Sequence, residues 1–324
     1  MRITTEKLLE LAQKEAEDRT GIVSAYVIGS AASGDPIFGG TADVDLVLIH
    51  EFEPVAEREI VQLSDQVHLD ITHHPRRLYK QPRELRVDPW LGPAMCEPVF
   101  LYDPNHFFEW AQASVRGQFH RTDYMLARGA AFLEKARASL EGLESDRLWL
   151  SGWTRALLEA ANAVASLEGF PAAGRRVMPQ LESKLTGLDQ PEIYGSFLRL
   201  LGAERFEASV ASEWVDSWAA NFASANEISS DPDLTMVRRD YYLGGFRSMI
   251  EAGAAVEILW PMLSTWDLAI YELTLAGESL PHWPQILNTL GLSSDHALDR
   301  EREMEDLLDQ VEGILENWAE KVGA

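Results

Sequence analysis

Two hydrophobic periodicities alternate over the first third of the chain. Apolar residues recur at helical spacing over residues 5–19, and several shorter apolar or alternating runs have the length and composition of strands. Residues 54–66 also show helical spacing, with Pro54 near the start, where proline is tolerated. The expected strands are 22–28, 44–49, 67–73 and 97–104. This order predicts a small α/β unit.

After Asn105 the pattern changes to long segments with apolar residues at i, i+3, i+4 and i+7. The expected helices are 105–118, 121–142, 147–169, 191–201, 204–226, 236–258 and 296–321. Nine of the ten tryptophans lie in this part, and the spacing of Trp214 and Trp218 is typical of a core. The apolar region 254–277 is interrupted by charged residues and predicts buried helices, not a membrane span.

The net charge and the cysteine content indicate which kinds of ligand and which cell compartment suit this protein. The 324 residues carry a net charge of −24, with ten basic and nineteen acidic residues in 1–110 and eighteen and thirty-three in the remainder. Acidity on both parts disfavours nucleic acid and suits either a cationic ligand or simple solubility. The single cysteine, Cys96, and an N-terminal segment without a signal-peptide core predict a cytoplasmic protein. An oligomer is compatible with the sequence.

Two aspartates open the strongly apolar strand at 44–49. Asp43 and Asp45 are two residues apart, so they project from one face of a strand at a backbone separation of roughly 6–7 Å. Two like charges this close are unfavourable without a cation. Asp70, in the next strand, can supply a third carboxylate, and three such groups can hold two Mg²⁺ ions about 3.5–4 Å apart.

Gly29 and Ser30 directly follow the strand at 22–28. A turn into a short helix at this point exposes backbone N–H groups and a hydroxyl, which together form a phosphate cradle. Neither a GxxxxGK[ST] nor a GxGxxG pattern is present. A lone Gly-Ser or Asp-x-Asp carries little information. Their combination, with twelve residues between them and a later strand aspartate, indicates a metal and nucleotide site.

This combination resembles the DNA polymerase β-type nucleotidyltransferase superfamily, and the helical region that follows is similar in general architecture to aminoglycoside and minimal nucleotidyltransferases. The resemblance implies an α+β protein with a small mixed-sheet nucleotidyltransferase domain at 1–110 and an all-helical substrate-binding domain at 111–324. It further implies that Gly29 and Ser30 bind the triphosphate of ATP or another NTP. Asp43, Asp45 and Asp70 would bind two Mg²⁺ ions.

The helical part offers further candidates through the same resemblance. Glu159 is the expected catalytic base. The other interpretation is that Glu159 is an ordinary exposed glutamate on a helix. Arg176 and Lys184, with the neighbouring Arg175, are expected to face phosphate, although Lys184 fits a solvated helix lysine equally well. His73 and His74 favour a polar turn over a metal site, because imidazole is a poor Mg²⁺ ligand. Tyr241, Tyr242 and the tryptophans favour core packing over base stacking.

Three functions fit these residues. The first is an Mg²⁺-dependent enzyme that moves AMP from ATP onto a hydroxyl of a small acceptor, such as a cationic aminoglycoside. The second is an antitoxin-type nucleotidyltransferase that adenylylates a separate partner protein. The third is a non-catalytic nucleotide-binding protein, which the intact Gly-Ser pair and the three aspartates disfavour. The sequence does not name the acceptor.

Overall fold

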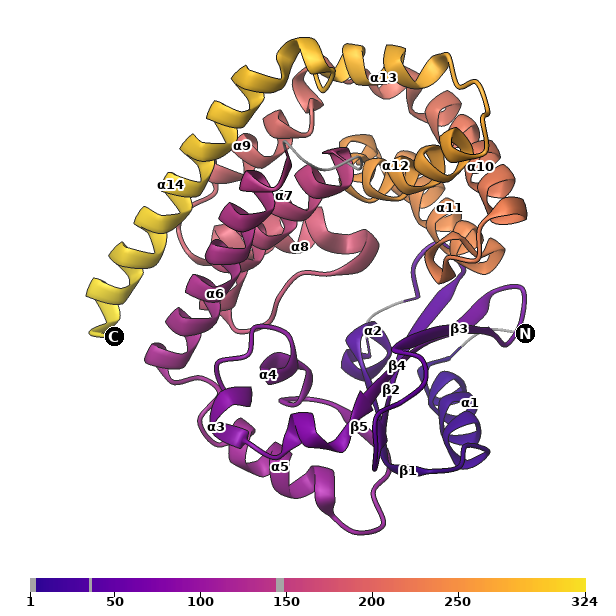
Figure 1. Cartoon of the computed structure of the whole chain (residues 1–324). Helices are drawn as coiled ribbons and strands as arrows, with labels where there is room; N and C mark the ends of the chain where they lie inside the picture. Colours follow the sequence, from indigo (N-terminus) through magenta and orange to yellow (C-terminus); the bar gives the residue numbers. More distant parts are fainter. Residues whose placement is uncertain (1–3, 35–36, 144–148) are drawn as a thin grey trace. The chain divides into compact units, whose positions relative to one another are not determined.

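The computed structural model describes residues 4–34, 37–143 and 149–324 (Figure 1). The chain divides into two compact units, Met1–Tyr124 and Met125–Ala324, here called the sheet unit and the helical unit. The division falls in the first turn of α6 (Thr122–Glu141), after the boundary of 110 expected from the sequence. The predicted α+β organisation, a small mixed sheet followed by an all-helical region, is confirmed.

The sheet unit is built on five strands in the order β3-β4-β2-β1-β5. Only β2 and β4 run parallel; the other neighbouring pairs are antiparallel. The strands are β1 (Ile22–Ile28), β2 (Ala42–His50), β3 (Arg58–Gln62), β4 (Val67–Pro75) and β5 (Val99–Tyr102). The helices are α1 (Thr5–Glu17), α2 (Gly29–Ser33), α3 (Pro82–Leu85), α4 (Leu91–Ala94) and α5 (Phe107–Arg116), with a 3₁₀ turn at Arg76–Tyr79.

Strand alternation gives the sheet two different faces. One face packs on α1, which begins at the N-cap Thr4 and presents buried residues at four-residue spacing. Its core includes Leu8, Ala12, Ala16, Val27, Val44, Leu46, Leu48, Leu69 and Ile71. The opposite face packs on α5 around Tyr26, whose ring stacks on Phe108 with centroids 4.1 Å apart and whose hydroxyl lies 2.7 Å from that of Tyr79. Asp43 and Asp45 are on this second face because they alternate with Val44 and Leu46.

One predicted element is wrong. The segment 54–66, expected to be a helix, contains β3, which pairs antiparallel with β4 from Arg58↔Thr72 to Gln62↔His68. The apolar spacing here suits a helix and a strand alike, and the ladder with β4 decides between them. The strands expected at 22–28, 44–49, 67–73 and 97–104 are confirmed as β1, β2, β4 and β5, with small shifts at their ends.

The helical unit contains the remaining helices. They are α7 (Trp149–Ala165), α8 (Val177–Gly187), α9 (Glu192–Leu200), α10 (Ala211–Ile228), α11 (Met236–Glu251), α12 (Leu259–Leu275), α13 (His282–Leu290) and α14 (Ala297–Val322). The helix expected from 204 begins only at Ala211, after two 3₁₀ turns, and α8 and α13 were not separately predicted. The first two residues of the helix expected at 147–169 lie outside the described residues.

Tryptophans form much of the core of the helical unit, as their spacing predicts. Trp153, Trp218 and Trp266 are almost fully buried. Each indole N–H donates a hydrogen bond, to Leu200 O, Thr265 Oγ1 and Asn221 Oδ1 respectively, at 2.8–3.1 Å. A buried indole with its N–H satisfied is a packing residue, so these rings belong to the scaffold. Among the described helices, none combines the length and hydropathy needed to cross a membrane.

Candidate active site

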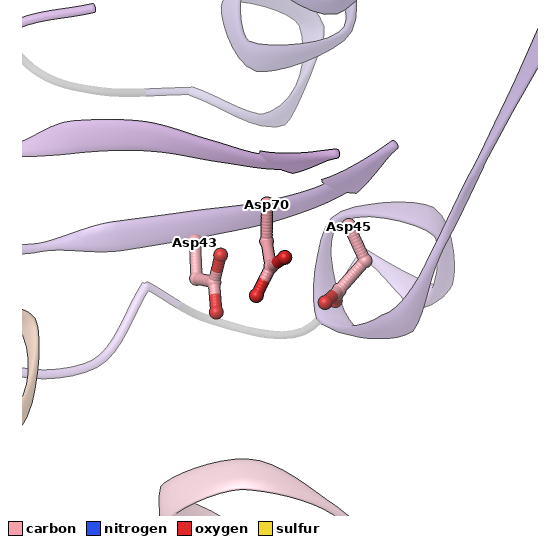
Figure 2. A group of neighbouring side chains, drawn as sticks. All are labelled: Asp43, Asp45 and Asp70. Carbon is pink, nitrogen blue, oxygen red and sulfur yellow. The ribbon is translucent and has the colours of Figure 1, made fainter. Parts of the chain in front are cut away.

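The parallel pairing of β2 and β4 brings three carboxylates together. Asp45 lies opposite Asp70 in this ladder, and Asp43 lies opposite His68. Paired residues project to the same side of a sheet, so all three aspartates share one face. One ligand atom from each lies within 4.8 Å of the others, and Figure 2 shows the three carboxylates on the same side of the strands. Within the described part of the chain, this is the one such cluster of three or more acidic, histidine or cysteine side chains.

Two basic side chains contact this triad. Arg58 of β3 donates from Nε to Asp70 Oδ1 at 2.6 Å and from Nη2 to Asp70 Oδ2 at 2.5 Å. His68 is 1% exposed, and its Nε2 lies 3.2 Å from Asp43 Oδ1. The sequence interpretation missed both residues. His68 could have been found, because it precedes Asp70 by two residues and so shares its face. Arg58 was assigned to a helix, where no register with Asp70 exists.

Gly29 is fixed by the site itself. It begins α2 with φ +70°, a conformation that favours glycine, and a Cβ built on it would lie 2.1 Å from Asp45 Oδ2. No L side chain fits there unless Asp45 moves. Ser30 follows in the first turn of α2 and is half-buried. The sequence predicts that Gly29 and Ser30 bind phosphate, which stays a prediction; the proximity of Gly29 to Asp45 is a finding of the structure.

The residues of the triad fit a divalent cation. Carboxylate oxygens are the ligands that Mg²⁺ prefers, and three of them converge here from adjacent strands. The close approach of Gly29 to Asp45 leaves backbone, not a side chain, beside one of these carboxylates. This arrangement can hold a cation at the carboxylates and admit an anionic ligand next to them.

Glu159 lies in α7 of the helical unit and is half-buried, not exposed. Its Oε2 is a buried atom with no hydrogen-bond partner among the described residues. Burial raises the pKa of the Glu159 carboxyl, and the charges of Lys135 and Arg155 oppose this shift by less. This shift is in the direction that a general base acting near neutral pH requires.

The other two predicted phosphate contacts also belong to the helical unit. Arg176 ends the 3₁₀ turn Gly174–Arg176 and is half-buried, while its neighbour Arg175 is buried with its guanidinium 3.8 Å from the centroid of the Tyr241 ring. Lys184 lies in α8, where burial lowers its pKa and the charge of Glu168 opposes the shift. Arg175 thus belongs to the core, and the phosphate roles of Arg176 and Lys184 stay predictions.

The histidines of β4 do not form a polar turn, since both lie within the strand. His73 Nδ1 lies 2.8 Å from His50 Nε2, and His74 Nδ1 lies 2.6 Å from the hydroxyl of Tyr79. Burial lowers the pKa of His74 to about 4. His74 is therefore a neutral hydrogen-bonding residue of the core at physiological pH.

Comparisons with known proteins give a likeness to solved structures only. No protein-family model matches the chain, and no curated protein matches it. A solved structure of a nucleotidyltransferase-like protein from Exiguobacterium sibiricum is similar to it: 11% of residues are identical, the match covers 94% of this chain and 89% of that chain, and the TM-score is 0.28. A likeness this weak assigns no residue, so the roles at the site rest on the geometry of this chain.

Proposed function

We propose that this protein is an Mg²⁺-dependent nucleotidyltransferase that transfers AMP from ATP onto a hydroxyl of a small cationic molecule, such as an aminoglycoside. The observation that carries the proposal is the triad: three carboxylates within 4.8 Å on adjacent strands, with the backbone of Gly29 against one of them. Adjacent carboxylates repel each other and need a cation. An open backbone turn beside them suits the phosphates that accompany such a cation.

In this function Asp43, Asp45 and Asp70 hold two Mg²⁺ ions. When bound, Mg²⁺ supplies charge to stabilise the leaving pyrophosphate and lowers the pKa of a coordinated hydroxyl. Gly29 and Ser30 bind the triphosphate through backbone N–H groups and the serine hydroxyl. The acceptor oxygen attacks the α-phosphorus of ATP, the bond from that phosphorus to the bridging oxygen breaks, and pyrophosphate leaves.

Further residues to which this proposal gives a role lie in the helical unit. Glu159 takes the proton of the attacking hydroxyl, a role supported by its raised pKa and its buried Oε2. Arg176 and Lys184 offset phosphate charge. A net charge of −24 over the chain favours a cationic acceptor and disfavours nucleic acid.

Pyrophosphate release tests the proposal. Each of the four NTPs is incubated with Mg²⁺ and one of three acceptors: an aminoglycoside, a neutral sugar with comparable hydroxyls, or a polyamine without hydroxyls. We expect release with ATP and the aminoglycoside, less with the sugar, and none with the polyamine, because charge aids binding and the hydroxyl is the nucleophile. Equal release with and without acceptors would show NTP hydrolysis, and no release with any pair would refute the proposed function.

A further inference from the structure

The three carboxylates of the triad differ in what already contacts them. Both oxygens of Asp70 accept hydrogen bonds from Arg58, at 2.6 and 2.5 Å. Asp43 is approached by the imidazole of His68, and Asp45 by the backbone of Gly29. Asp70 thus has a two-point guanidinium contact. The Asp70 side chain is 10% exposed and that of Arg58 is 32% exposed, so the contact is partly shielded from water.

The register of the sheet holds this contact in place. Arg58 pairs with Thr72 and Ile60 pairs with Asp70, so Arg58 lies one same-face position along from Asp70 on the neighbouring strand. A long side chain reaches such a diagonal neighbour. The planar guanidinium matches the two oxygens of a carboxylate, which makes this geometry the strongest form of the pair.

The contact also restricts what Asp70 can bind. A carboxylate offers about four lone-pair positions, and a two-point arginine contact uses two of them. A divalent cation at the triad needs an oxygen of Asp70 and places a double positive charge near the guanidinium. Arg58 and the cation are therefore competitors, both sterically for lone pairs and electrostatically.

We infer that Arg58 is a positioning residue that holds Asp70 in the cation-free site and lowers the affinity of the triad for divalent cations. Asp70 becomes a ligand of the cation when its contact with Arg58 weakens. The inference rests on the proposed function, because it takes the triad as the metal site. It makes an unusual prediction, namely that removing Arg58 improves metal binding.

Mn²⁺ alone is the probe, because its free form is measured directly by electron paramagnetic resonance without nucleotide or turnover. We expect Arg58→Gln to bind Mn²⁺ about tenfold more tightly than the wild type, since a nearby positive charge and a competitor for Asp70 are both removed. Arg77→Gln is the matched control: Arg77 makes a comparable contact with Glu53 on the surface of the same unit. This control should bind within about twofold of the wild type.

A double-mutant cycle separates competition from a general charge effect. In an Asp70→Asn background, Arg58→Gln should raise Mn²⁺ affinity by only about threefold, because the repulsion by the Arg58 charge is still removed but the competition for Asp70 is already absent. An equal gain in both backgrounds would overturn the inference, as would unchanged or weaker binding in Arg58→Gln alone. If Arg58→Gln loses the circular-dichroism spectrum of the wild type, Arg58→Lys replaces it, with an expected gain of about threefold and the same overturning results.

Failure of the proposed function would look different. If neither the wild type nor the Arg58 variants bind Mn²⁺, the triad is not a metal site and both proposals are refuted. If the wild type binds Mn²⁺ and Asp43→Asn/Asp45→Asn does not, the metal site stands, and the Arg58 variants alone decide the inference.

Discussion

The two units satisfy their buried polar side chains in different ways. In the helical unit, the buried guanidinium of Arg300 donates to three backbone carbonyls, Gly291 O, Leu290 O and Arg199 O, at the ends of helices α13 and α9, and also to the carboxylate of Glu303. In the sheet unit, by contrast, the polar groups at the triad contact one another, side chain to side chain, across adjacent strands. The first arrangement closes helix ends, and the second gathers charge at one place.

This difference separates scaffold from candidate chemistry. A buried arginine that donates to carbonyls is fully used by the fold, whereas three gathered carboxylates are stable only with positive charge beside them. In the helical unit, the buried Oε2 of Glu159, like the hydroxyl of Tyr194, has no hydrogen-bond partner among the described residues. Variants at the triad test the proposed chemistry of the sheet unit, and variants at Glu159 test that of the helical unit.

The largest effect is expected at the triad. Asp43→Asn/Asp45→Asn keeps size and removes the charge that would hold a cation, so turnover should fall by about 10⁴-fold or more, with loss of Mg²⁺-dependent ATP binding. Calorimetry with Mg·ATP and pyrophosphate release measure the two effects. Asp123→Asn, at an exposed aspartate paired with Arg121, is the control and should behave as the wild type. Unchanged Mg·ATP affinity in the double variant would remove the metal assignment.

A second large effect is expected from the helical unit. Glu159→Gln should reduce turnover by about 10²–10⁴-fold, the usual range for a general base, and leave Mg·ATP binding intact. The wild-type rate should also rise with pH through the raised pKa of Glu159, because the base acts when ionised. Steady-state rates across pH measure this. Turnover of Glu159→Gln within about twofold of wild type would refute the role of Glu159 as the general base.

A smaller effect is expected from a substitution at Gly29, whose backbone lies close to Asp45. Gly29→Ala and Gly34→Ala impose similar strain, since the two glycines have φ of +70° and +72°, but only at Gly29 does the added Cβ meet Asp45. Both variants should lose about 1–3 kcal/mol of unfolding free energy. Gly29→Ala alone should also lose about 10²-fold in turnover, through displacement of a ligand. Equal activity in the two variants would contradict this role of Gly29.

The smallest effect concerns stability and pH. Burial raises the pKa of Glu159 above its ordinary value of 4.5, so the folded protein binds more protons than the unfolded chain between these values. Stability then falls as pH rises from about 4.5 through the raised pKa. Glu159→Gln lacks this loss and should melt about 1–2 °C higher than wild type at pH 7, with no difference below pH 4.5. Thermal denaturation at both pH values measures it; a lower melting temperature at pH 7 would contradict the effect of burial.

Much of the sheet unit could be predicted because period-2 patterns encode it. The alternation around Asp43 and Asp45 fixes their shared face, and the strand containing Asp70 follows from the same rule. The parallel register that places Asp45 opposite Asp70 could not be predicted, since pairing between strands depends on contacts distant in sequence. Arg58 was missed for the same reason, because β3 is defined by its ladder with β4 and not by its own sequence.

In the helical unit, helix existence was easier to predict than side-chain environment. Helical periodicity identifies α7, but it does not determine that Glu159 is half-buried with an unpartnered oxygen, because that depends on neighbouring helices. The helix α8 spans only Val177–Gly187 and directly follows a 3₁₀ turn, so its periodic segment is short. The burial of Arg175 against Tyr241 likewise follows from packing between segments far apart in the chain.

The single parallel pair in the sheet has a consequence for folding order. β1 with β2 and β3 with β4 are antiparallel pairs of strands that follow one another along the chain, the first joined through α2 and the second by residues 63–66, so each pair closes a smaller loop than the pairing of β2 with β4 does. Asp43 and Asp45 belong to the first pair, and Asp70 and Arg58 to the second. Neither hairpin contains a whole triad. The complete site exists only once the two hairpins have joined along β2 and β4, and any cation bound by all three carboxylates stabilises that junction specifically.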